Sequence, residues 1–458
     1  MSFDSLSVLK ELVAFPSVSA DSQFKRGLAE ARDYLEDKLQ SIGFTVEVIE
    51  TPVHPLLLAE RRVNPHAPTV VIYGHYDVQP PDPLDLWDSD PFVAEVRGNR
   101  VYGRGAADNK GPVAVYLAVL SELLEEKPDL DLNLVVLLEG EEEIGSPSFE
   151  PVLKKYADRI RGDFVLACDT GSQREDQLSV TTGLRGITCL EIRLKGPDRD
   201  LHSGIFGGAI LNPLQALAGL CSSLHHQDGT VNVAGFYDEV IEAEDWERRE
   251  ISRIDRSLDD LGKLLGVNHF FPPPGFDPFE AIRLAPTLEF NGMGGGYQGE
   301  GSKTVIPRES FVKISCRLVA NQDAGQIQRQ LVQAIRDRCP PQMELEILKQ
   351  HNGNPYRVVP PGKPHAPENQ NKYLARAFET TEALSQSLFG RTPLFLTEGG
   401  SIPIIADIKE VLDMDTLLIG LYLPGDNAHA PNESFHLGMM GKGKELLKGI
   451  LRSLPRER

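Results

Sequence analysis

The stretch from Val70 to Glu143 constrains the fold of this chain more than any other. It contains two short apolar runs, Val70 to Tyr73 and Asn133 to Leu138, whose composition is typical of buried strands. His75 and Asp77 follow the first run, and a row of glutamates follows the second. In open α/β sheets, ligand sites lie at the edge formed by the carboxyl ends of the strands. The stretch therefore predicts an α/β fold with a polar site at one edge of its sheet.

The side chains expected at this edge are of the kinds that bind metals. His75 and Asp77 are two residues apart, so on an extended chain they point the same way. Asp108 ends a loop of small residues, Asp169 ends the apolar run FVLAC, and His429 lies in a polar loop near the end of the chain. Together with one glutamate of the row that follows Leu138, these residues provide two histidines and three carboxylates. Such a set suits two Zn²⁺ ions that share one bridging carboxylate.

The middle of the chain has a different pattern. Its strand-like runs alternate between apolar and polar residues, and two amphipathic helices separate them in the order β-α-β-β-α-β. The runs are Ile187–Lys195, Leu211–Leu224 (helix), Thr287–Phe290, Phe311–Val319, Gln326–Arg338 (helix) and Met343–Lys349. We therefore expect an inserted α+β two-layer domain of ferredoxin-like type at residues 186–357. Residues 1–185 and 358–458 would form a larger α/β domain, with a mainly parallel, mixed sheet flanked by helices.

Composition argues against several classes of function. The formal net charge of −20 argues against nucleic acid or an anionic membrane as a partner. No apolar run reaches the roughly 18 residues of a membrane span, and the amino terminus lacks the pattern of a signal peptide. The five cysteines are scattered, which indicates reduced thiols and a cytoplasmic protein.

Eight ordered motifs resemble metallopeptidase family twenty, the dizinc group that includes cytosolic nonspecific dipeptidase, carnosinase, aminoacylase and glutamate carboxypeptidase. In order they read HYDVQP, GRGAADNKGP, EGEEEIGS, CD, LHSGIFGG, TVIP with a following ISCRLV, TEGGSIP and NAHAPNE. Their spelling is most similar to the nonspecific dipeptidase and carnosinase branch. The resemblance covers most of the chain.

The resemblance implies a role for each metal-capable residue. Asp108 would bridge two Zn²⁺ ions, with Mn²⁺ or Co²⁺ as other possible metals. His75 and Asp169 would complete one ion, and Glu143 and His429 the other. The family also has a cis peptide after the bridging aspartate, here between Asp108 and Asn109.

Further residues would perform or assist catalysis. The resemblance implies that Glu142 is the general base, that Asp77 orients His75, and that His202 stabilises the oxyanion from the inserted domain. The family's histidine often reaches the site of a partner subunit, so a homodimer through the inserted lid domain is expected. Other residues would bind the carboxylate of a small peptide substrate: Arg317, Thr304, Gly400 and Ser401.

The sequence leaves two questions open. The glutamate row has one member more than the usual pair, so a slip of one residue in the alignment would assign both the base and the ligand to other glutamates. Register with the EGxEExGS pattern makes Glu141 a solvated neighbour. The zinc core is also common to several activities. We expect a dipeptidase, with an N-acyl-amino-acid deacylase or a carboxypeptidase as rivals and a non-enzymatic peptide-binding protein as the remote alternative.

Overall fold

The computed structural model describes residues 2–455, apart from the side chains of residues 349 and 350. The chain divides into two compact units. The first comprises residues 2–182, 358–396 and 407–455, and the second comprises residues 183–357 and 397–406. The sequence placed the short segment 397–406 with the larger domain, whereas in the structure it groups with the second unit.

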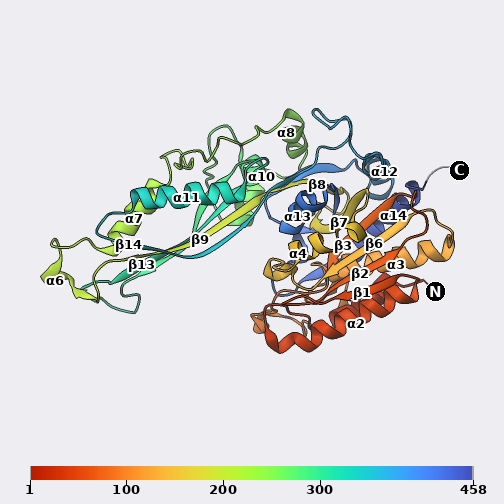
Figure 1. The fold of residues 1–458 in the computed structure, drawn as a ribbon, viewed down its shortest axis with the longest axis horizontal. Helices are drawn as coiled ribbons and strands as arrows, with labels where there is room; N and C mark the ends of the chain where they lie inside the picture. Colours follow the sequence, from red (N-terminus) through yellow and green to blue (C-terminus); the bar gives the residue numbers. More distant parts are fainter. Residues whose placement is uncertain (1, 456–458) are drawn as a thin grey trace. The chain divides into compact units, whose positions relative to one another are not determined.

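A mixed sheet of nine strands, eight of which lie wholly or mostly in the first unit, forms the centre of that unit (Figure 1). Its main path runs β1-β2-β6-β3-β7-β17-β8-β15, and β16 pairs with β8. The central strands β6, β3, β7 and β17 are parallel, while β1, β2, β8 and β15 pair antiparallel with their neighbours. The strands are β1 (Thr45–Ile49), β2 (Leu56–Arg61), β3 (Thr69–His75), β6 (Asn133–Glu139), β7 (Phe164–Gly171), β8 (Ser179–Leu184), β15 (Tyr356–Arg357), β16 (Leu394–Glu398) and β17 (Thr416–Tyr422).

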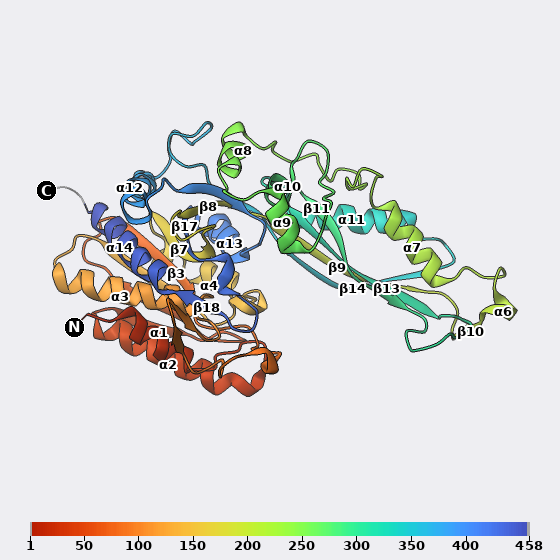
Figure 2. The same ribbon diagram turned by 180° about the vertical axis from the view of Figure 1, so that it is seen from behind.

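Helices cover both faces of this sheet. Helices α3, α12 and α14 pack side by side, and each contacts the sheet at β3 or β17 (Figures 1 and 2). On the other face, Phe149 of α4 makes an edge contact with Tyr73 of β3, with ring centroids 5.8 Å apart. The helices are α1 (Ser5–Val13), α2 (Lys25–Ser41), α3 (Lys110–Glu126), α4 (Phe149–Lys155), α5 (Ala157–Ile160), α12 (Lys372–Phe389), α13 (Pro403–Leu412) and α14 (Leu437–Ser453). Because both faces are covered, β3 and β6 are buried along their whole length, as their continuous apolar runs predict.

The last helix begins later than its sequence indicates. The residue pattern predicts a final helix from about Glu433 to Leu451, but α14 begins at Leu437. The preceding residues form β18 (Ser434–His436), which pairs with β5 (Arg100–Tyr102) and, through it, β4 (Glu95–Arg97). Pairing with a strand far away in the sequence outweighs the local helical pattern here. The sequence also did not reveal β2, β8 or α13.

The second unit is a two-layer sandwich. Its four-stranded antiparallel sheet has the order β11-β13-β9-β14, which is the ferredoxin-like arrangement. Helices α7 and α11 lie along one face of the long strands (Figure 1). The main elements are β9 (Gly186–Lys195), α7 (Pro213–Ser223), β11 (Thr287–Gly295), β13 (Glu309–Leu318), α11 (Ala324–Arg338) and β14 (Glu344–Gly353).

Alternation along β9 and β13 explains the core of this unit. Every second residue of each strand is buried, which places Leu190, Ile192, Ile314 and Cys316 in one apolar cluster with residues of α7 and α11. The opposite face carries partly exposed side chains. Smaller elements complete the unit: β10 (Leu201–His202), α6 (Ser203–Phe206), α8 (Asp245–Ser252), α9 (Leu258–Leu265), α10 (Pro278–Leu284) and β12 (Val305–Ile306). Within residues 2–455, no helix is both long enough and apolar enough to span a membrane.

Candidate metal centre

His75 is held rigidly at the carboxyl end of β3. Its side chain is fully buried, and Nδ1 lies 3.1 Å from the backbone oxygen of Asp77 and 3.4 Å from its Oδ1. The opposite ring nitrogen, Nε2, lies 3.0 Å from Oδ1 of Asp108. Asp77 also accepts hydrogen bonds from the backbone N–H groups of Glu142 and Glu143, at 3.3 and 3.1 Å. One buried carboxylate therefore positions both the imidazole and the turn that carries the two glutamates.

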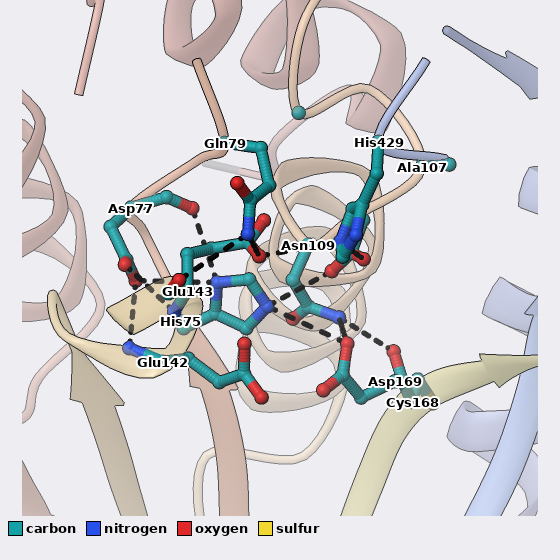
Figure 3. A network of polar contacts seen from close by, with 12 residues as sticks. His75, Asp77, Gln79, Ala107, Asn109, Glu142, Glu143, Cys168, Asp169 and His429 are labelled. Atoms are coloured by element: carbon teal, nitrogen blue, oxygen red, sulfur yellow. Dashed lines mark hydrogen bonds and ion pairs between the residues drawn. The ribbon is translucent and has the colours of Figure 1, made fainter. Parts of the chain in front are cut away.

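Five of the predicted residues form two overlapping groups with metal-binding potential (Figure 3). In each group, one potential ligand atom per residue lies within 4.8 Å of the others. Asp108 belongs to both: Oδ1 faces His75, and Oδ2 lies 2.9 Å from Nε2 of His429. The groups are His75, Asp108 and Asp169, and Asp108, Glu143 and His429. A carboxylate shared in this way can bridge two cations.

The electrostatics of this cluster fit bound cations. Burial and the neighbouring Asp108 raise the pKa of Glu143 to about 7, and the same two causes raise the pKa of Asp169. Hydrogen bonds to Asp108 and Glu143 raise the pKa of His429 to about 11. In addition, Oε1 of Glu143 is buried without a hydrogen-bond partner. Carboxylates crowded at this depth require protons or a cation, and imidazole with carboxylate is a donor set that binds divalent metals.

The other predicted residues belong to the second unit, where they form two groups. His202 lies at the end of β10 opposite Val305 of β12, and Ser203 donates its N–H to the backbone oxygen of Thr304. The exposed His202 also accepts a hydrogen bond from the N–H of Gly204 through Nδ1. In the second group, Arg317 donates to the hydroxyl of Ser401 at 2.8 Å, and Gly400 precedes that serine.

Comparison with known proteins identifies the family. The model of peptidase family M20/M25/M40 matches residues 71–453. The chain belongs to this family. The Cys-Gly metallodipeptidase dug1 of Schizosaccharomyces pombe is 30% identical over 457 residues, which cover 96% of this chain and 93% of that protein. The human Beta-Ala-His dipeptidase is 30% identical over 456 residues, covering 94% of this chain and 86% of that protein.

Solved structures show the same relationship. A metallo-carboxypeptidase of the M20 family from Sulfolobus solfataricus, Sso-CP2, has a TM-score of 0.85 at 29% identity and covers 99% of both chains. Human carnosine dipeptidase 1 has a TM-score of 0.79 at 27% identity, covering 98% of this chain and 95% of that one. The protein is therefore a hydrolase of the metallopeptidase type with the M20 α/β fold, and its family membership implies the use of divalent metal.

Three residues that the sequence did not assign hold the candidate metal ligands of this M20 peptidase in place. Gln79 donates to Oε2 of Glu143 at 2.8 Å, and the side-chain amide of Asn109 donates to Oδ1 of Asp169 at 2.7 Å. The peptide bond between Asp108 and Asn109 is cis, as the resemblance implied. The third residue is Glu433.

Glu433 supports the Asp108 loop through four hydrogen bonds. Its side chain is 1% exposed and accepts from Arg104 Nη1 at 2.7 Å and from the backbone N–H groups of Gly105, Ala107 and Asp108 at 2.8, 2.9 and 3.0 Å. In the sequence, Glu433 is the last residue of the motif NAHAPNE, and no local pattern there indicates this role. The role becomes visible only in the structure, where the loop that carries Glu433 contacts the loop that ends at Asp108.

The expectation for Glu141 in this M20 peptidase was wrong. The sequence suggested a solvated neighbour, but the residue is 2% exposed. It accepts hydrogen bonds from the hydroxyl of Thr51, the N–H of His54 and the N–H of Ser148, at 2.6, 2.8 and 3.0 Å. Glu141 points into the protein, where it fastens the loop at residues 51–54.

Proposed function

We propose that this enzyme hydrolyses the peptide bond of dipeptides, and that it does so with two Zn²⁺ ions per chain. The observation that carries this proposal is the sharing of Asp108 between two ligand groups. One ion would be held by His75 and Asp169 and the other by Glu143 and His429, with Asp108 between them. When bound, such ions polarise a carbonyl group and lower the pKa of water.

Glu142 is the residue best placed to move protons. Its backbone is fixed by Asp77, and in Figure 3 its carboxylate is directed towards the space shared by His75 and Asp169. Burial, with Asp169 and Glu143 adding to it, raises the pKa of Glu142, whereas bound cations would act in the opposite direction. A carboxylate in this position can take a proton from the attacking water and return it to the leaving amine.

Residues of the second unit would recognise the substrate. Arg317 would pair with the free carboxylate, assisted by Thr304, Gly400 and Ser401, because a guanidinium suits bidentate contact with a carboxylate. His202 would stabilise the oxyanion. Donation of His202 to the site of a partner chain, in a homodimer formed through this unit as a lid, follows from the resemblance to the family.

Several relatives support a dipeptide as the substrate, since the Schizosaccharomyces pombe and human proteins bear dipeptidase names. A second candidate is carboxypeptidase activity, which the likeness to Sso-CP2 favours. The two differ in the length of peptide accepted. A cytoplasmic location remains a prediction from the cysteines, which all carry thiols rather than disulfides.

The test is a hydrolysis screen over dipeptides, N-acetyl amino acids and tetrapeptides, with metal content measured on the same samples. We expect dipeptides to be cleaved at least tenfold more efficiently than the other two classes. Faster release of single residues from tetrapeptides would favour the carboxypeptidase, and faster cleavage of N-acetyl amino acids would favour the deacylase.

A further inference from the structure

A cavity of about 440 Å³ lies within the second unit, on the side of its sheet that α7 and α11 do not cover. Its floor includes Glu289 of β11 and Ser315 and Arg317 of β13. Its wall comes from the loop before α10 and from α10 itself, and includes Phe270, Phe271 and Ile282. We call this cavity, defined by those six residues, the Arg317 pocket. Its size is in the range of cavities that bind small molecules.

The floor of the Arg317 pocket carries two guanidinium groups that make no ion pair within the described residues, although the carboxylate of Glu289 is near enough to act on Arg185. Within residues 2–455, neither Arg317 nor its neighbour Arg185 has a carboxylate within ion-pair distance; Arg317 donates to the hydroxyl of Ser401 instead. Burial, followed by the nearness of Arg317, lowers the pKa of Arg185 to about 10. An anion bound at Arg317 would relieve the repulsion between the two guanidinium groups.

The wall of the pocket exposes large apolar side chains. Phe271 is 74% exposed and Ile282 is 44% exposed, and Phe270 lies beside them. Large apolar side chains gathered at the rim of a cavity indicate a binding surface. The exposed Glu289 would repel an acidic group in the same space. The pocket thus combines one site for an anion with a larger apolar space.

We propose that the Arg317 pocket holds the carboxyl-terminal residue of the dipeptide and selects large apolar side chains, such as those of leucine, methionine and phenylalanine. This rests on the proposed function in one respect, the pairing of the substrate carboxylate with Arg317. The carboxylate and the side chain of an amino acid are attached to the same Cα atom. A carboxylate bound at Arg317 therefore brings the side chain to the apolar wall, and both contacts lie within one unit.

The first test compares Ala-Phe, Ala-Leu and Ala-Gly as substrates of the metal-loaded enzyme and of Phe271→Ala. Burying a large apolar side chain should make kcat/KM for Ala-Phe and Ala-Leu at least about tenfold higher than for Ala-Gly. In Phe271→Ala this preference should fall about three- to tenfold, because KM should rise more for Ala-Phe and Ala-Leu than for Ala-Gly. Leu264→Ala is the matched control, since Leu264 is 65% exposed in α9 and does not line the pocket. Equal efficiency for the three substrates, or an equal effect of Phe271→Ala on all of them, would overturn the assignment.

A binding measurement separates this assignment from the proposed function. Calorimetry on the full-length, metal-loaded protein compares L-phenylalanine with glycine, so that contributions of the amine and carboxylate cancel. We expect at least about fivefold tighter binding of phenylalanine, lost in Phe271→Ala. If no dipeptide is cleaved but this difference is present, the proposed function fails and the pocket assignment stands. Equal binding of the two amino acids refutes the pocket assignment whatever the hydrolysis screen shows.

Discussion

Replacement of Glu433 by glutamine would disturb the Asp108 loop without changing any residue proposed to bind metal. The carboxylate oxygens each accept two hydrogen bonds, one pair from Arg104 and Gly105 and the other from Ala107 and Asp108. In either orientation, the amide nitrogen of a glutamine would face two donors from which it cannot accept. Two buried donors without an acceptor cost about 1–3 kcal/mol each. Arg104 is 1% exposed and also loses its counter-charge, and breaking a buried pair costs about 3–5 kcal/mol.

These two costs overlap, so we expect Glu433→Gln to lower the free energy of unfolding by roughly 3–6 kcal/mol. That is less than the whole stability of most domains, so the variant should fold. Because the N–H of Asp108 loses its anchor, we also expect roughly 10–100-fold weaker metal binding.

Two assays separate these effects. Urea unfolding of metal-free protein measures stability, and competition with a chromophoric chelator measures the affinity for Zn²⁺. The matched control is Glu247→Gln in the second unit, where Glu247 is 7% exposed and pairs with Arg357. It should lower stability and leave metal affinity unchanged. Unchanged metal affinity in Glu433→Gln, despite the expected loss of stability, would refute a positioning role for Glu433.

The remaining predictions concern the base, the dimer and a partly buried acid. Glu142→Gln should lower kcat about 10²–10⁴-fold and keep both metals, whereas Glu143→Gln should lose one; the opposite result, by kinetics and elemental analysis, would shift the register by one residue. A mixture of inactive His202→Ala and Glu142→Ala chains should regain activity after subunit exchange, and heterodimers that stay inactive would contradict donation of His202 to the partner. Burial and, to a smaller extent, the charge of Glu150 raise the pKa of Asp407 to about 6. The ionised Asp407 therefore destabilises the fold increasingly as pH rises from about 4 through 6. With the partial exposure of the side chain allowed for, Asp407→Asn should therefore raise the free energy of unfolding by roughly 1 kcal/mol at pH 7 and leave it unchanged at pH 3.5. Urea unfolding at the two pH values measures this difference, and an equal gain at both would exclude the charge of Asp407 as its cause.

Local patterns predicted the elements in which one periodicity dominates. Along β9 and β13 the apolar residues alternate strictly, so burial on one face follows from the pleat of a strand. The continuous apolar runs of β3 and β6 likewise predicted strands covered on both faces, and therefore the edge where His75 and the glutamates lie. Residue types at strand ends were enough to predict a candidate metal centre.

Features that depend on distant contacts were not predictable from local patterns. Glu433 meets the N–H of Asp108 across 325 residues of sequence, and nothing near Glu433 specifies those donors. Residues 434–436 looked helical but form β18, because β5 offers them a pairing partner. Glu141 looked solvated because the loop that it fastens, at residues 51–54, lies about 90 residues earlier.

The central claim, a dinuclear centre built on Asp108, is tested most directly by counting metal ions while activity is restored. Metal-free protein would be titrated with Zn²⁺, and bound metal and dipeptide hydrolysis would be measured on the same samples, with Asp108→Asn as a companion. We predict that wild-type activity reaches its maximum at two ions per chain, and that Asp108→Asn binds both ions more weakly. Full activity at one ion per chain, or loss of only one ion in Asp108→Asn with the other bound at wild-type affinity, would contradict the shared carboxylate.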